Sequence, residues 1–121
     1  MRKLILPLLM SALLSTAARA EGELRHLVCF KFSEKATPEK IEMVEKAFAE
    51  LPSKIDTIQS FEWGTNVSKE NHDKGFTHCF QLTFKDQAGL DTYIPHPAHK
   101  AFGEKLAGLI EDVFVFDYVA K

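Results

Sequence analysis

The order of hydrophobic and polar residues along the chain predicts four β-strands. The first is the compact apolar and aromatic run 26–32, and the clearest is 76–85, in which every second residue lies on one apolar face. Period-two patterns of this kind are typical of strands with one buried face. Two further runs, 58–67 and 113–119, predict the other strands, and Gly64 indicates a bulge in the former.

Three stretches between these strands carry helical signals. The first begins at Thr37, a good N-cap, followed by Pro38 at the first helical position, and we expect it to end at Pro52. Its apolar residues recur at three- and four-residue steps and form one stripe: Ile41, Val44, Ala47, Phe48 and Leu51. A short helix is expected over 86–94, where prolines follow, and a longer one over 98–110.

The order β-α-β-β-α-β predicts a fold of the α+β class. It is the split βαβ, or ferredoxin-like, arrangement, in which the helices cover one face of a four-stranded antiparallel sheet. Strand parity places a mainly apolar set on the uncovered face: Leu27, Cys29, Cys79, Phe114, Phe116 and Tyr118. A face this apolar is rarely left in water. We therefore expect a homodimer, a dimeric α/β barrel, formed through a two-fold interface.

The first twenty residues have the three parts of a secretory signal peptide. Arg2 and Lys3 are followed by the apolar run 4–14, and Ala18-Arg19-Ala20 fits the small-x-small cleavage pattern. The apolar run is too short to span a bilayer, which needs about 20 residues. We therefore expect cleavage after Ala20 and export to the periplasm or the extracellular space. The mature chain, residues 21–121, is expected to be one domain that is not held by a membrane.

Removal of this segment makes the chain more acidic. Three of the 15 basic residues lie within it, so 12 basic and 17 acidic residues remain. No basic patch survives, and nucleic acid is excluded as an expected partner.

The candidate chemistry lies in histidine and tyrosine side chains. His26 and His78 fall on the aromatic, helix-covered faces of their strands, while His96 and His99 lie with Tyr93 in the segment Tyr93-Ile94-Pro95-His96-Pro97-Ala98-His99. A histidine on an apolar face is often only a hydrogen-bonded core residue. Two on one face, beside a segment that could cap the same cavity, indicate a pocket able to transfer protons.

Several segments together resemble the stress-responsive α/β-barrel (Dabb) family. They cover essentially all of the mature chain: Arg25-His26-Leu27-Val28-Cys29-Phe30-Lys31-Phe32, Glu62-Trp63-Gly64, Gly75-Phe76-Thr77-His78, Tyr93-Ile94-Pro95-His96-Pro97-Ala98-His99 and Phe116-Asp117-Tyr118. The Tyr-x-x-His-Pro-x-His segment is the most specific of these. The family includes a plant polyketide cyclase that closes a linear poly-β-keto thioester by an intramolecular aldol condensation, without a metal or cofactor.

The resemblance implies roles for five residues. His99 matches the catalytic base of the cyclase and Tyr93 the tyrosine paired with it, while His26 and His78 match two further pocket histidines. The cyclase has a pocket tyrosine where this chain has Phe48. The missing hydroxyl group indicates a different substrate for this chain.

Three classes of function follow from these residues. The first is a small-molecule-binding protein whose His/Tyr pocket holds a ligand without turnover. The second is a cofactor-independent acid–base enzyme, a cyclase or lyase acting on an enolisable substrate, with His99 as base and Tyr93 at the developing oxyanion. The third is a histidine-ligated metal or haem protein, for which His96-x-x-His99 has one-turn spacing. We expect no metal, because no acidic or cysteine ligand is close in sequence and His96 lies between two prolines. The resemblance to the cyclase implies that no cofactor is needed.

The two cysteines lie on strands expected to be neighbours at the centre of the sheet. We take these strands as a parallel pair, whose register cannot be derived from the sequence. Cys29 and Cys79 are level with each other only in some registers. Free cysteines pack as small hydrophobic residues. We expect two buried, unreactive thiols on the dimer face.

Overall fold

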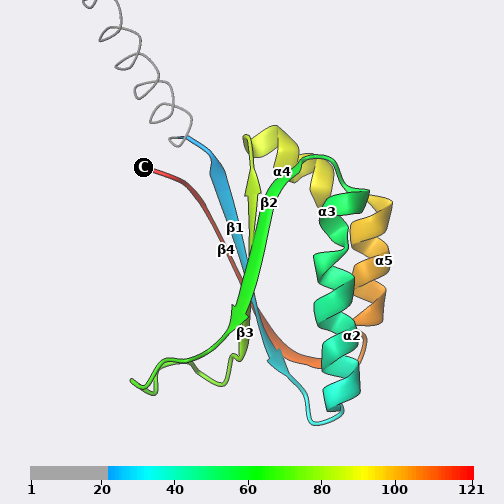
Figure 1. Ribbon diagram of the computed structural model, residues 1–121, viewed down its shortest axis with the longest axis vertical. Coiled ribbons are helices and arrows are strands. Elements are labelled where there is room, and N and C mark those ends of the chain that lie inside the picture. Colours follow the sequence, from blue (N-terminus) through cyan, green and yellow to red (C-terminus); the bar gives the residue numbers. More distant parts are fainter. Residues whose placement is uncertain (1–21) are drawn as a thin grey trace, which may run out of the picture.

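The computed structural model describes residues 22–121, so the predicted signal peptide lies outside the described residues. Eight elements follow one another in this part of the chain (Figure 1): β1 (Leu24–Phe32), α2 (Pro38–Ala49), α3 (Leu51–Lys54), β2 (Ile58–Thr65), β3 (His78–Phe84), α4 (Gln87–Tyr93), α5 (Pro97–Lys105) and β4 (Ile110–Val119). None of the helices over residues 22–121 has the length and apolar character that crossing a membrane requires.

The four strands form one sheet in the order β2-β3-β1-β4. Every neighbouring pair is antiparallel, and the helices lie together on one face of the sheet (Figure 1). The predicted ferredoxin-like fold is confirmed. The parallel pairing assumed for the two cysteine strands is wrong, because β3 runs antiparallel to β1.

Local signals place the starts of the helices correctly but not all of their ends. Thr37 caps α2 by accepting a hydrogen bond from the Lys40 backbone N–H at 3.3 Å, with Pro38 at the first helical position. The prediction that Pro52 ends this helix is wrong. The helix stops at Ala49, and Pro52 lies in the first turn of α3, where its missing N–H costs no hydrogen bond.

The last helix is shorter than its apolar stripe predicts. It ends at Lys105, and Gly108 then adopts a left-handed conformation with φ +77° that turns the chain back to the sheet. Ser33 at the end of β1 holds this turn, because its backbone N–H donates to the Leu109 carbonyl oxygen at 2.7 Å. Ile110 therefore starts β4 instead of extending the helix.

The predicted bulge at Gly64 is also wrong. Gly64 pairs regularly with Cys79, and the irregularity in β2 lies between Ile58 and Ser60. The strand ends at Thr65, two residues earlier than expected, and in the loop that follows the Asn66 side chain accepts a hydrogen bond from the Ser68 backbone N–H at 2.9 Å.

Aromatic side chains dominate the core between the sheet and the helices. Phe80, at the middle of β3, is fully buried and stacks on Phe48 of α2 with ring centroids 4.3 Å apart. Phe30 of β1 and Phe61 of β2 pack against the same two rings. This cluster joins the first helix to three strands.

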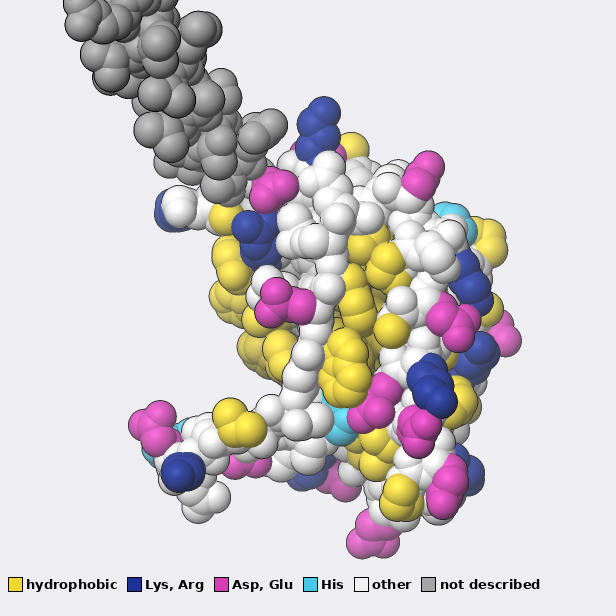
Figure 2. Space-filling model, in the orientation of Figure 1, with side chains coloured by type: hydrophobic (Ala, Val, Ile, Leu, Met, Phe, Trp, Pro, Cys, Tyr) yellow, Lys and Arg dark blue, Asp and Glu magenta, His cyan; other side chains and the backbone are white. Residues whose placement is uncertain are grey.

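The helices do not cover β4, an edge strand of the sheet. Val113 and Val115 face the helix side but are 50% and 51% exposed, and Phe116, on the other side, is 52% exposed. Figure 2 shows hydrophobic side chains gathered over β4 on the left of the view, away from the helices. Both sides of this strand therefore offer apolar surface to a further partner.

The cysteines lie directly opposite each other on β1 and β3, on the face that the helices leave open. Both are free and half-buried in the single chain, and their full burial in a dimer stays a prediction. Burial, and next a hydrogen bond with Cys79, raise the pKa of the Cys29 thiol to about 12, so this thiol stays protonated at neutral pH.

Candidate active site

A cavity of about 310 Å³ lies between the sheet and the last two helices. It is lined by the helix-facing sides of β1 and β4 and by residues of α2, α4 and α5: His26, Val28, Phe30, Phe48, Tyr93, Ile94, His99, Phe102, Gly103, Leu106, Val113 and Val115. The lining is apolar except for two histidines and a tyrosine. Three polar groups in an apolar enclosure are typical of a small-molecule site, in which they fix the orientation of the ligand.

His26 is held in this cavity by a carboxylate. It lies opposite Asp117 in the β1–β4 pairing, and its Nδ1 atom is 2.5 Å from the Asp117 Oδ1 atom. The His26 side chain is only 8% exposed, against 39% for Asp117. A carboxylate can only accept here, so Nδ1 carries the proton and Nε2 is the nitrogen left with a lone pair.

The sequence analysis did not identify Asp117 as a site residue. It named Asp117 only as part of the segment Phe116-Asp117-Tyr118. Strand parity contains the signal, because Asp117 lies between Phe116 and Tyr118 and must face the other way, towards the helices. An acidic residue on the buried side of a strand needs a partner. Its partner is a histidine of the adjacent strand.

Tyr93 and His99 meet across the break between α4 and α5. Tyr93 is the last residue of α4 and is 1% exposed, and its ring centroid is 4.4 Å from that of His99. Burial raises the pKa of the Tyr93 phenol, which therefore remains protonated and able to donate a hydrogen bond. His99 Nδ1 donates to the Ile94 carbonyl oxygen at 2.9 Å, which leaves Nε2 as an acceptor.

His96 serves the start of the helix. Its Nδ1 accepts a hydrogen bond from the Ala98 backbone N–H at 3.0 Å, so it caps α5, and Pro97 takes the first helical position. This cap places His99 in the first turn, next to Tyr93. The residues 22–121 hold no group of three histidine, cysteine or acidic side chains placed to bind a metal ion.

His78 does not belong to this cavity, contrary to the prediction of a shared pocket. It pairs with Phe30, which lies four residues from His26 along β1, so the two histidines are about 14 Å apart. Its Nε2 is 2.8 Å from Glu45 Oε2 of α2, and its ring lies parallel to that of Trp63. Strand parity placed His78 on the correct face of the sheet. Its position along β3, however, brings it against α2 and not into the cavity.

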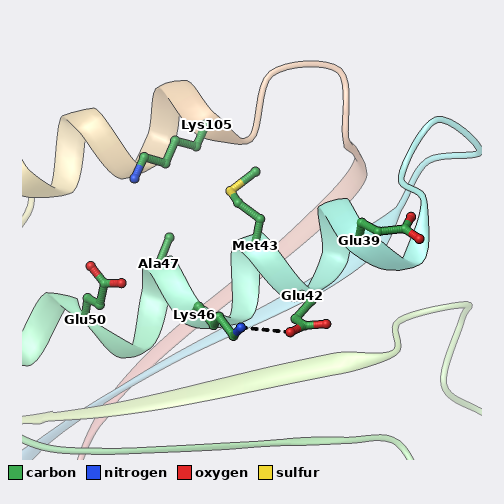
Figure 3. Close-up of a pocket in the computed structure, with 7 residues that line it drawn as sticks. All are labelled: Glu39, Glu42, Met43, Lys46, Ala47, Glu50 and Lys105. Carbon is green, nitrogen blue, oxygen red and sulfur yellow. Dashed lines mark ion pairs between the residues drawn. The ribbon is translucent and has the colours of Figure 1, made fainter.

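A larger groove of about 500 Å³ lies on the outer surface of α2 and α5. Figure 3 shows its lining of mainly charged side chains with Met43 among them, and the ion pair between Glu42 and Lys46, whose charged atoms are 2.9 Å apart. This pair lies one helical turn apart on an exposed surface, where it contributes little. The groove offers no buried polar group to a ligand, so the His/Tyr cavity is the candidate site.

Comparison with known proteins agrees with this geometry. The model of the family described as Stress responsive A/B Barrel Domain (Dabb) matches residues 24–120. The chain belongs to this family. The resemblance noted from the sequence motifs is thereby confirmed, and it extends over nearly all of the described residues.

Two relatives and one solved structure are similar to the chain. It is 38% identical over 99 residues to the stress-response A/B barrel domain-containing protein HS1 of Arabidopsis thaliana, covering 82% of this chain and 91% of that protein. It is 31% identical over 97 residues to olivetolic acid cyclase of Cannabis sativa, covering 80% and 96%. A dimeric protein of unknown function with a ferredoxin-like fold from Bacteroides fragilis has a TM-score of 0.66 and 28% identity, covering 82% and 97%.

Proposed function

We propose that the cavity binds a small, largely apolar molecule that carries a carbonyl or hydroxyl group. One observation carries this proposal. Two histidines line an apolar cavity, each has Nδ1 engaged by an oxygen acceptor, and a protonated tyrosine lies between them. The volume of about 310 Å³ lies at the lower end of the usual range for ligand sites, so the ligand is expected to be small.

Acid–base catalysis is the second candidate, and the Tyr93–His99 pair favours it. The hydrogen bond from His99 Nδ1 to the Ile94 carbonyl oxygen holds the ring and leaves Nε2 free to accept a proton from a substrate. In this mechanism His99 Nε2 removes a proton from a carbon next to a carbonyl group, and Tyr93 donates a hydrogen bond to the oxyanion that forms. A relative named as a cyclase supports this chemistry for the family fold.

Two variants test both candidates on enolisable ketones of graded size. Tyr93→Phe should weaken binding about tenfold, because one hydrogen bond in a buried site is lost. His99→Ala should retain binding but lose exchange of the α-proton for deuterium in D₂O, followed by NMR. His72→Ala, in the exposed β2–β3 loop, is the control and should match wild type in both assays.

The results separate binding from catalysis. A ketone that binds without exchange in wild type supports a binding protein and removes the catalytic candidate. If both site variants bind and exchange as wild type does, the cavity has been assigned wrongly.

We also propose that the chain is exported and that it works as a homodimer. Export rests on the three-part pattern of residues 1–20, and N-terminal sequencing of the protein from its native cells should begin at Glu21. Soluble protein that retains Met1 would contradict export. The homodimer is supported by the uncovered apolar surface of β4 and by the dimeric relative from Bacteroides fragilis.

A further inference from the structure

A second buried polar cluster lies outside the cavity, around His78 of β3. The His78 side chain is 7% exposed, and both of its ring nitrogens are engaged. The Glu45 carboxylate of α2 can only accept, so Nε2 donates to Glu45 Oε2 at 2.8 Å, and Nδ1 accepts from the Thr77 hydroxyl group, also at 2.8 Å. Phe32 of β1 packs edge-on against the same ring, with centroids 5.0 Å apart. With both nitrogens occupied, His78 has no polar atom to offer to a ligand.

Glu45 lies on the side of α2 that faces the sheet. Its side chain is 23% exposed, while its neighbours on that side, Val44 and Phe48, are fully buried. Removing a carboxylate from water costs free energy, and an apolar pair of similar size often stabilises a core equally well. A hydrogen bond, however, has a narrow range of length and direction, which apolar contacts lack. The His78–Glu45 contact therefore fixes the position of α2 relative to β3 at this point.

Two paths connect this pair to the wall of the cavity. Along α2, Phe48 lies three residues after Glu45, on the same face of the helix, and lines the cavity. Across the core, the connection is a continuous stack of rings. Trp63 of β2 lies parallel to His78, with ring centroids 5.9 Å apart, and Phe80 is stacked on Trp63 at 5.5 Å and on Phe48 at 4.3 Å. A displacement of α2 at Glu45 would therefore move Phe48, because close-packed interiors transmit such shifts.

We propose that His78 and Glu45 are a positioning pair that fixes the Phe48 wall and so limits the size of the ligand. This role rests on the proposed function of the cavity. With the pair intact, Phe48 packs against Phe102 of α5, with ring centroids 4.7 Å apart, and the two rings form a continuous part of the cavity wall. Without the pair, α2 is held here by apolar contacts alone and can shift along the sheet, which lets Phe48 withdraw and widens the cavity.

Selectivity for ketone size tests this role. Glu45→Ala removes the hydrogen bond and supplies a good helix former, whereas Glu45→Gln retains an acceptor for His78 Nε2. The Kd values of 2-pentanone and 2-nonanone, measured by NMR titration, give a ratio that a loss of stability alone does not change, because unfolding weakens both equally. Glu45→Ala should shift this ratio about tenfold towards 2-nonanone. Glu45→Gln, and Glu42→Ala on the exposed side of α2, should keep the wild-type ratio.

A second variant gives an answer if Glu45→Ala fails to fold. His78→Phe keeps an aromatic ring beside Trp63 but has no nitrogen for Glu45, so it should shift the ratio in the same direction. A wild-type ratio in Glu45→Ala or in His78→Phe, or an equal shift in Glu42→Ala, would overturn the proposal.

Hydrogen exchange without any ketone tests the pair independently of the proposed function. In Glu45→Ala the backbone amides of α2 should exchange about tenfold faster relative to those of β1, while Glu45→Gln stays close to wild type. Unchanged exchange of α2 in Glu45→Ala would overturn the positioning role. If no ketone binds to any form while α2 exchanges faster in Glu45→Ala, the proposed ligand is wrong and the positioning of α2 by this pair stands.

Discussion

Replacing Phe80 with alanine should lower the free energy of unfolding by about 3–5 kcal/mol. The side chain is fully buried at the middle of a central strand, and its ring packs against those of Phe48, Phe61 and Trp63. Truncation leaves a cavity between the sheet and α2. The surrounding aromatic rings, which belong to two neighbouring strands and one helix, cannot move enough to fill it. For a domain of this size the midpoint of thermal unfolding should fall by more than about 12 °C.

Urea unfolding of Phe80→Ala and Phe76→Ala measures this effect against a matched control. Phe76 precedes β3 and lies outside the core cluster, so the same truncation there should cost much less. Equal losses at both positions would show that the aromatic cluster does not dominate the stability of the domain.

Replacing Phe116 with aspartate should convert the proposed dimer to monomer. Phe116 is half-exposed in the single chain, between Phe114 and Tyr118 on the open face of the sheet, and a second copy would bury it. Burying an unpaired carboxylate in both copies is costly, so the dimer Kd should rise by at least about 1000-fold.

Light scattering at micromolar concentration measures the mass of each form. Met43→Asp introduces the same charge on the outer surface of α2 and should leave the dimer intact. A wild-type protein that is monomeric at this concentration would refute the homodimer, whatever the variant does.

Local patterns in the sequence determined much of this structure. Alternation assigned the faces of β1 and β3, and Thr37 and Pro38 placed the start of α2, because these signals act between residues that are close in the chain. The Tyr93–His99 pair was also accessible, because one helix ends at Tyr93 and the next begins only four residues later, at Pro97.

The remaining features depend on contacts between distant residues. The apolar spacing of α5 continues to Ile110, but the contact of Ser33 with the turn at Gly108 starts the strand there. Whether His78 shares a cavity with His26 depends on the register of β3 against β1. The role of Asp117 as the partner of His26 follows only from the pairing of β4 with β1.

Two sets of side chains alternate along β4 and serve different purposes. Val113 and Val115 line the cavity and Asp117 contacts His26, while Phe114, Phe116 and Tyr118 lie on the opposite, open side of the sheet. Inserting or deleting one residue near the start of this strand would exchange the two sets at once, because side chains in a strand alternate with a period of two. The strand can therefore accept conservative substitutions at many positions, but a change in its length would damage the ligand site and the outer surface together.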